Sequence, residues 1–425
     1  MAAAKTATAM LLSLTLLGLA EPALADGAFP DELSVYLPPN DASKVMLGTN
    51  FGLVISPDSG QSWRFVCELY ITTSGADLVK YYKIASDGAI LAISFVNLWR
   101  SSDGGCSWTR AGGSVASLDV LDAFIDPNDP TFVLALANNP TGSGIYPSHD
   151  GGLTFGPPLY TSSDLMTGIE IARSNGNTVY AAQAHAANSG GQGGAYLLRS
   201  DDRGQTWPIK QQLQVSSSTV PRIAAVDSAN ADTVYLRLLA LSESRDEIAV
   251  TTDNGKTLTP LATLTGGAVF FTSFLRANDG TLYAGTSSSD LYVQAPGAQG
   301  FTKRVGPRAR CLGQRYGESR VYACGDGFLD GYNLGYSDDG ANSFKRMMRF
   351  NDIAGPLTCP AVQNFCAIQY LNLMQTLNGN DAGSAGIDAG TGPSQPSGSS
   401  CTTGGAGLGA LLALTALLWR RRRHA

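Results

Sequence analysis

An eight-residue pattern, S-x-D-x-G-x-[ST]-W, returns at a steady interval along most of this 425-residue chain. Five successive aspartates of the pattern are 45, 47, 52 and 51 residues apart, and a last gap of 86 residues holds two intervals of 43. The missing copy falls near residue 296, where residues 294–301 keep only turn glycines and a terminal aromatic residue. The six clear copies are centred on Asp58, Asp103, Asp150, Asp202, Asp253 and Asp339. Such periodicity predicts seven similar structural units.

Each copy has the composition of a tight hairpin turn. The side chains of Asp, Ser and Thr hydrogen-bond to the backbone in such turns, and glycine supplies a positive φ angle. One strand directly precedes each copy, as at residues 52–55, and a second lies further upstream, as at residues 178–181. Adding an innermost strand and the strand that the closing aromatic residue begins, each unit makes four strands, which is one propeller blade. Because one blade cannot bury both of its faces, the seven units are expected to close into a ring.

The eight-residue pattern resembles the Asp box of the BNR-type propeller family, and the likeness spans residues 30–350. The resemblance implies an all-β fold, a single seven-bladed β-propeller of four-stranded blades, which we assign to residues 26–350. It also places the boxes on the rim of the propeller, away from its central channel. The six box aspartates are therefore interpreted as structural residues of the turns and not as catalytic acids.

Residues 351–377 follow the last repeat and change the period of the apolar pattern. Large apolar residues recur there at helical spacing, as at Tyr370, Leu373 and Leu377, and Asn378-Gly379 is a stop signal. We expect a disulfide-bridged loop and a short C-terminal helix that packs on the propeller.

The cysteines of the body form an even set, which in an exported chain predicts disulfides. The set is Cys67, Cys106, Cys311, Cys324, Cys359 and Cys366. Pairing near neighbours predicts three bridges. These are Cys311 to Cys324 across a hairpin of blade seven, Cys359 to Cys366 beside the helix, and Cys67 to Cys106 between blades one and two.

Both ends of the chain have the composition of targeting segments. Residues 1–25 hold Lys5, an apolar stretch and the small-residue site Ala23-Leu24-Ala25, which predicts a cleavable signal peptide. Residues 378–400 are mainly small and polar, so they are expected to form a disordered linker. Residues 401–425 combine Cys401, an apolar run from Gly404 to Trp419 and four consecutive arginines.

A cysteine, an apolar helix and an arginine cluster at the end of a chain resemble the myxobacterial C-terminal sorting signal. In that family the tail is removed near the cysteine, so Cys401 is the expected point of processing and attachment. The alternative is a plain hydrophobic tail anchor, whose arginines would stay cytoplasmic. Both alternatives predict an exported protein at the cell surface, attached to the envelope or outer membrane through its tail, or secreted after the tail is processed.

The charge of the body argues against nucleic acid as a partner. Without the charged residues of the two targeting segments, 24 basic and 34 acidic residues remain, so the body is about ten charges negative. Binding to phosphates needs clustered Lys and Arg. Only His149 and His185 precede the tail, and no cysteine pair has the CxxC spacing, so no metal site and no cofactor are predicted.

Three acids outside the boxes, Asp119, Asp122 and Glu68, are the remaining candidates for hydrolytic chemistry. Sialidases of the propeller family hold their substrate with arginines, and their N-terminal Arg-Ile-Pro motif is missing from residues 28–31. Asp-box hydrolases of β-glucans divide two acids between two propellers, whereas the repeats here make one. We therefore interpret the three acids as exposed loop carboxylates and assign no catalytic residue.

Two loops have a functional interpretation beside the structural one. His185 lies in a Gly-rich insertion of blade four, residues 183–194, and such loops carry function when a rigid scaffold presents them. We adopt the other interpretation, a mobile loop with an incidental histidine. Asp126, Asn128 and Asp129 could offer oxygens to calcium. The same residues match a β-turn that recurs in other blades, which is the interpretation we adopt.

The sequence thus predicts a surface-displayed binding or scaffold module for a ligand, protein or glycan, that no motif identifies. The alternative is a carbohydrate-active hydrolase, sialidase-like or another glycosidase, which the missing arginine motif disfavours. A weaker alternative is an assembly factor for a membrane complex, by analogy of fold with single Asp-box propellers of photosynthetic organisms.

Overall fold

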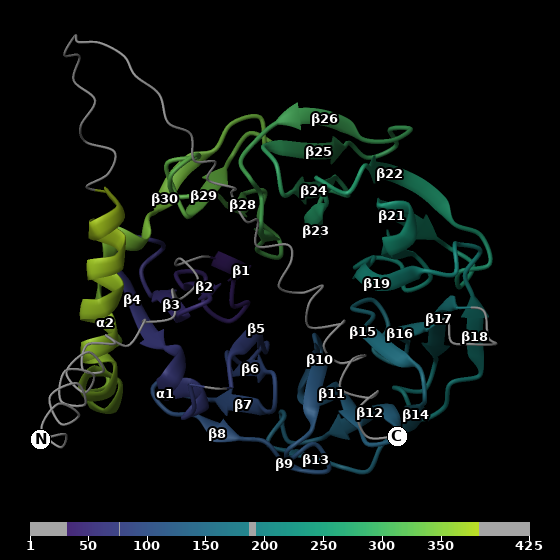
Figure 1. The fold of residues 1–425 in the computed structure, drawn as a ribbon, viewed down its shortest axis with the longest axis horizontal. Helices are drawn as coiled ribbons and strands as arrows, with labels where there is room; N and C mark the ends of the chain where they lie inside the picture. Colours follow the sequence, from purple (N-terminus) through teal and green to yellow (C-terminus); the bar gives the residue numbers. More distant parts are fainter. Residues whose placement is uncertain (1–31, 76, 187–192, 382–425) are drawn as a thin grey trace, which may run out of the picture. The chain divides into compact units, whose positions relative to one another are not determined.

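Seven antiparallel sheets follow one another around an axis and form the blades of a propeller (Figure 1). The computed structural model describes residues 32–75, 77–186 and 193–381. Every blade has four antiparallel strands that are consecutive in the chain, apart from one short strand, β13 (Thr154–Phe155), between the last two strands of blade three. The sheet of blade one gains a fifth strand at its outer edge. The predicted all-β, seven-bladed propeller is confirmed, including a sixth blade at the degenerate repeat.

The strands of each blade are given from the ring axis outwards. Blade one comprises β1 Glu32–Tyr36, β2 Val45–Thr49, β3 Gly52–Ser56 and β4 Trp63–Cys67, and blade two comprises β5 Val79–Ile84, β6 Ile90–Ser94, β7 Leu98–Ser101 and β8 Thr109–Arg110. Blade three comprises β10 Asp119–Asp126, β11 Asp129–Asn139, β12 Gly142–Ser148 and β14 Tyr160–Ser162, and blade four comprises β15 Leu165–Ile171, β16 Val179–His185, β17 Gly194–Ser200 and β18 Ile209–Gln212. Blade five comprises β19 Thr219–Val226, β20 Val234–Ala240, β21 Arg245–Thr251 and β22 Thr259–Thr265, and blade six comprises β23 Phe271–Arg276, β24 Leu282–Thr286, β25 Asp290–Gln294 and β26 Thr302–Val305. Blade seven comprises β27 Leu312–Gln314, β28 Val321–Cys324, β29 Leu334–Ser337 and β30 Lys345–Met348. The short strands β9 Gly112–Gly113 and β13 Thr154–Phe155 pair in parallel between blades two and three.

The antiparallel order of the strands gives the ring two different faces. The turn between the first and second strands of a blade and the Asp-box turn between the third and fourth lie at one end, which we name the box face. The turns between the second and third strands and the connections between blades lie at the other end, which we name the loop face. Buried side chains of neighbouring blades pack against each other and form the core, and the second strands β2, β6 and β24 are buried at every residue.

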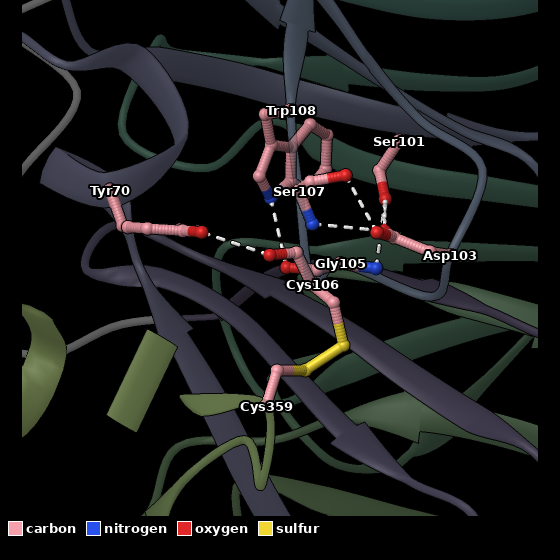
Figure 2. Close-up of a disulfide and its surroundings, with 8 residues drawn as sticks. All are labelled: Tyr70, Ser101, Asp103, Gly105, Cys106, Ser107, Trp108 and Cys359. Carbon is pink, nitrogen blue, oxygen red and sulfur yellow. Dashed lines mark hydrogen bonds between the residues drawn. A yellow bond between two sulfur atoms is a disulfide. The ribbon is translucent and has the colours of Figure 1, made fainter. Parts of the chain in front are cut away.

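Figure 2 shows the Asp box of blade two, in which one carboxylate organises the whole turn. Asp103 accepts hydrogen bonds from Ser101 Oγ at 2.8 Å, from Ser107 N at 2.9 Å and from Ser107 Oγ at 2.6 Å. Gly105 N donates to Ser101 Oγ at 2.9 Å, and Trp108 Nε1 donates to Gly105 O at 3.1 Å. Both oxygens of this carboxylate are thus engaged in the turn.

The fifth position of the box needs glycine for two reasons. Gly60 has a φ of +92°, which favours a residue without a side chain. A Cβ atom on Gly60 would also lie 2.7 Å from the side chain of Met347 in blade seven, and one on Gly152 would lie 3.0 Å from Leu91 in blade two. The boxes therefore set the close approach of neighbouring blades as well as the turn. The last box has Ala341 in this position, at a φ of +61°.

The four strands of blade one and the four of blade seven each come from one continuous stretch of chain, and the segment after blade seven closes the ring. A 3-10 turn at Phe350–Asp352 leads to β31 Ile353–Pro356, which pairs in parallel with β4 on the outer edge of blade one. The helix α2 Pro360–Asp381 then runs beside β4 (Figure 1). Its buried residues Val362, Cys366, Leu373 and Leu377 join the core of blade one. A second helix, α1 Glu68–Thr72, connects blades one and two, and a 3-10 turn at Leu241–Glu243 lies in blade five.

Two of the three predicted disulfide pairings are wrong. The bridge between Cys311 and Cys324 is confirmed, but Cys67 pairs with Cys366 and Cys106 pairs with Cys359 (Figure 2). Cys359 directly precedes α2, and Cys366 lies seven residues further along it. Seven residues of helix rise about 10 Å, which is beyond the reach of a disulfide. Near-neighbour pairing failed because ring closure brings residues 359–366 against blades one and two.

The helix is longer than the sequence indicated. It ends at Asp381 and so includes residues 378–381, which were predicted to begin the linker. The rest of the predicted linker, the signal peptide at residues 1–25 and the sorting tail with Cys401 lie outside the described residues. Within the described residues, no helix is both long and apolar enough to cross a membrane.

Candidate functional site

Charged side chains of four blades meet around the ring axis. We name this set, Tyr81, Lys83, Asp122, Glu170 and Arg222, the axial cluster. They come from the innermost strands of blades two to five, namely β5, β10, β15 and β19 (Figure 1). Each inner strand begins at the loop face, so Tyr81, Asp122 and Arg222, from its first half, lie nearer the loop face. Lys83 and Glu170 lie deeper, towards the box face.

Asp122 holds the inner strands of three blades together. Its carboxylate accepts hydrogen bonds from Ala123 N at 2.8 Å, from Ile169 N at 3.2 Å and from the hydroxyl of Tyr81 at 3.1 Å. Tyr81 also reaches the carbonyl oxygen of Leu121 at 2.6 Å. The prediction that Asp122 is an exposed loop carboxylate is therefore wrong, because it lies half-buried on β10 and positions its neighbours.

Lys83 is held by aromatic rings and a carboxylate. Its Nζ lies 5.5 Å from the ring centres of both Tyr81 and Phe124, and 3.6 Å from Asp122 Oδ1. The ring faces and the carboxylate stabilise its positive charge. The described residues provide no acceptor within hydrogen-bond distance of this ammonium, so its three donors stay available.

Glu170 is a carboxyl group with a strongly altered protonation equilibrium. Its Oε1 accepts a hydrogen bond from Val226 N of the next blade at 2.8 Å. Burial raises the pKa of Glu170 to about 7; that hydrogen bond and the charge of Lys83 lower it, and Asp122 raises it further. Around neutral pH a large part of this group is therefore uncharged.

Arg222 is exposed and has no hydrogen bond or ion pair with any described residue. The packing around it lowers the pKa of its guanidinium, as does Arg237 on the adjacent strand, whereas Asp122 and Tyr81 raise it. Asp122 and Tyr81 belong to blades three and two, so a side chain of blade five interacts with them across the ring axis. Arg237 itself is neutralised by Asp246, with Nη2 and Oδ2 2.8 Å apart.

The protonation of Glu170 makes a prediction for stability. Its pKa is higher in the folded chain than the usual 4.5, so the folded state binds a proton more tightly than the unfolded state, and stability falls as the pH rises from about 4.5 through about 7. Glu170→Gln removes this loss. At pH 8 the variant should be more stable than the wild type by on the order of 2 kcal/mol, with the difference vanishing towards pH 4.5. Urea unfolding at both pH values measures it, with Glu243→Gln on an exposed turn as the control. An equal difference at both pH values would contradict the assignment.

The other two acids considered for hydrolysis are also not exposed loop carboxylates. Asp119 lies on β10, where Lys80 Nζ contacts Oδ1 at 2.9 Å and Asn138 Nδ2 donates to Oδ2 at 2.9 Å. Glu68 is the first residue of α1 and accepts a hydrogen bond from Val79 N at 2.6 Å. Burial raises the pKa of Glu68 to about 7, against that hydrogen bond. Neither acid joins the axial cluster.

His185 is held in place by a carboxylate. Its Nδ1 lies 2.6 Å from Asp164 Oδ1, and Lys210 Nζ lies 3.4 Å from Asp164 Oδ2. Residues 187–192 of the predicted Gly-rich insertion lie outside the described residues.

The β-turn interpretation of residues 126–129 is confirmed. Asn128 N donates to Asp126 Oδ1 at 2.9 Å, and Arg203 Nη2 contacts Asp126 and Asp129 at 2.9 and 3.0 Å. The carboxylates of this turn bind an arginine of the blade-four box. No group of three or more potential metal-binding side chains is present in the described ranges.

The loop face carries most of the exposed apolar side chains. Among the described residues, seven of the twelve large hydrophobic residues that are exposed lie on it. The seven are Leu78, Phe95, Val96, Leu241, Val305, Phe328 and Leu329. Only Leu153 and Tyr316 lie on the box face, and the other three lie on α2.

The loop of residues 325–333 displays two of these side chains on a rigid backbone. Asp326 Oδ1 accepts hydrogen bonds from Phe328 N at 2.9 Å and from Leu329 N at 3.0 Å, and Asp326 N donates to Asp330 Oδ2 at 2.7 Å. Arg349 Nη2 adds a bond to Gly327 O at 3.0 Å. Phe328 and Leu329 are 56% and 63% exposed. The loop is therefore shaped before any partner arrives.

Sequence reasoning missed Lys83, Glu170 and Arg222. A signal was present for two of them, since Glu170 and Arg222 are each the single charge of an inner strand, as in Gly168-Ile-Glu170-Ile-Ala172; the strand of Lys83 also holds Lys80. Their meeting could not be read from the chain, because Lys83 and Arg222 are 139 residues apart.

No family model matches this chain, and no curated protein is significantly similar to it. Among solved structures, hydrazine synthase of Kuenenia stuttgartiensis aligns with a TM-score of 0.55 at 11% identity, over 76% of this chain and 100% of that one. YCF48 from Cyanidioschyzon merolae gives 0.46 at 14% identity, over 70% and 96%. An ancestral GH74 enzyme gives 0.45 at 17% identity over 74% of this chain and 48% of that one, so the chain spans about half the length of that enzyme. The chain thus has the seven-bladed propeller fold, while its likeness to the BNR-type family and to the sorting signal stays a prediction.

Proposed function

We propose that this protein is an exported binding module that recognises a protein partner through its loop face. The observation that carries the proposal is the unequal distribution of exposed apolar side chains between the two faces. These side chains come from blades two, five, six and seven, with adjacent pairs at Phe95–Val96 and Phe328–Leu329. Exposed apolar groups that gather on one face of a soluble protein mark sites of interaction. The rigid display of Phe328 and Leu329 lowers the entropy that a partner must overcome on binding.

Export is supported by the cysteine chemistry. Three disulfides indicate an extracellular protein or one of another oxidising compartment. Attachment to the cell surface through the tail at residues 401–425 completes the proposal, with residues 382–400 as the linker.

The test compares recovery of a partner by variants of the two faces. Phe328→Ser combined with Leu329→Ser should reduce the partner cross-linked to the full chain on intact cells by tenfold or more. Tyr316→Ser removes an exposed aromatic side chain from the box face and should leave recovery of the partner unchanged. Quantitative mass spectrometry of the cross-linked material gives the ratio. Equal recovery by all three chains would refute recognition through the loop face.

A glycoside hydrolase is the second candidate, and one observation favours it. Glu170, whose pKa burial raises to about 7, shares the ring axis with a second carboxyl group, Asp122, and glycosidases use a pair of carboxyl groups in different roles. The hydrogen bonds that surround Asp122 fit a positioning role better. Purified protein should therefore show no turnover of sialyl or glucan substrates. Turnover that Glu170→Gln or Asp122→Asn abolishes would replace the binding proposal with this one.

A further inference from the structure

Several charged groups around the ring axis are held in ion pairs. Lys80 pairs with Asp119, Lys83 with Asp122, and Arg237 with Asp246. Arg222 forms no ion pair in the described part of the chain, and the charge of Asp122 acts on it from a longer distance. Glu170 takes part in no ion pair with a described residue either, and a large fraction of this carboxyl is uncharged near neutral pH.

The same groups hold unused hydrogen-bond donors. A guanidinium has five N–H donors in a planar fork that matches the two oxygens of a carboxylate, and an ammonium has three. Arg222 and Lys83 donate none of theirs to a described residue within hydrogen-bond distance. Tyr81, by contrast, already uses its hydroxyl proton on Leu121 and Asp122.

The cluster is also fixed before any ligand arrives. Lys83 lies against two ring faces, Glu170 is anchored by Val226 N, and Asp122 is held by two backbone N–H groups. Arg222 is exposed, so its donors are accessible, and its place in the first half of β19 puts it on the side of the loop face.

We propose that the axial cluster is a binding site for a compact monoanion of the carboxylate class, with Arg222 as the primary anchor and Lys83 as the second donor group. A single negative charge balances the single unpaired positive charge. A dianion such as phosphate would instead bring an extra negative charge towards Asp122. The ligand enters from the loop face and meets Arg222 before Lys83.

Acetate is the probe for this site, because it presents the carboxylate alone. Titration calorimetry with the wild-type chain at constant ionic strength should give a dissociation constant on the order of millimolar, as expected for so small a ligand. Arg222→Gln should weaken binding at least tenfold and Lys83→Gln by a smaller factor. Arg346→Gln, which removes an exposed arginine paired with Asp352, is the control and should bind like the wild type.

Crystals soaked in sodium bromide locate the site independently of affinity. An anomalous peak beside the Arg222 guanidinium in the wild type, absent in Arg222→Gln, is the expected result. Circular dichroism of each variant checks the fold, and Arg222→Lys, which keeps the charge, should retain part of the binding. A wild-type chain that binds no acetate, or an Arg222→Gln chain that binds it equally well, overturns the proposal. The outcome does not depend on the protein partner proposed above.

Discussion

Replacing Cys67 and Cys366 together by serine is expected to lower the melting temperature by on the order of 10 °C. This bridge spans a sequence separation of 299 residues. A cross-link stabilises mainly by restricting the unfolded chain. Because the Cys106–Cys359 bridge stays in place, the Cys67–Cys366 bridge closes an effective loop of roughly 50 residues, which is worth about 4 kcal/mol. In a domain of this size each kcal/mol corresponds to roughly 2–4 °C. Calorimetry of the two chains under non-reducing conditions measures the effect.

The bridge between Cys311 and Cys324 is the matched control, with a separation of only 13 residues. Its removal by the same double substitution should cost about 3 kcal/mol, because the loop it closes is short. A loss as large as that of the long-range bridge would show that ring closure contributes nothing special to stability.

Arg315→Met is expected to destabilise the folded chain by about 3 kcal/mol. Arg315 is 6% exposed, and its guanidinium donates to the carbonyl oxygens of Pro38 at 2.6 Å, Asp41 at 3.1 Å and Lys44 at 2.9 Å. It thereby joins the box-face turn of blade seven to that of blade one. Methionine fills much of the space but leaves buried carbonyl oxygens without donors, which costs about 1–3 kcal/mol each where no water replaces them.

Urea unfolding measures this loss, and Arg346→Met is the control, because its arginine makes an ion pair at the surface. Such exposed pairs contribute about 0–1 kcal/mol. Arg315→Lys should fall between the wild type and methionine, since an ammonium cannot reach three carbonyl oxygens with the same geometry. A methionine variant as stable as the control would mean that the two turns are held together by other contacts.

The sequence carried the local features of this fold and not its closure. The Asp boxes could be predicted because Ser101, Asp103 and Gly105 act on one another within five residues, and the degenerate sixth unit followed from the period alone. The pairing of Cys67 with Cys366 depends on how the two ends of a ring of more than 300 residues meet. Nothing local to either cysteine indicates that.

The axial cluster escaped prediction for a similar reason. Asp122 was named as a candidate acid, but its neighbours on the ring axis come from other blades, at positions 81, 170 and 222. The sequence reveals that an inner strand contains a charged residue. Which residues of other blades lie opposite it depends on how the ring closes. Blade count fixes which strands meet, and the chemistry of the axis follows from that.

The attachment of α2 to blades one and two bears on how the protein would carry a mechanical load. Tension applied to the chain beyond Asp381 passes along α2 and reaches blade one through the Cys366 bridge and blade two through the Cys359 bridge. Both bonds are covalent, so the pull is shared between two blades and does not peel β30 away from blade seven. A propeller held at its C-terminal end would keep its ring shut under shear for as long as both bridges stay oxidised. In a reducing medium the same pull would first strip α2, then β31, and open the ring between blades seven and one.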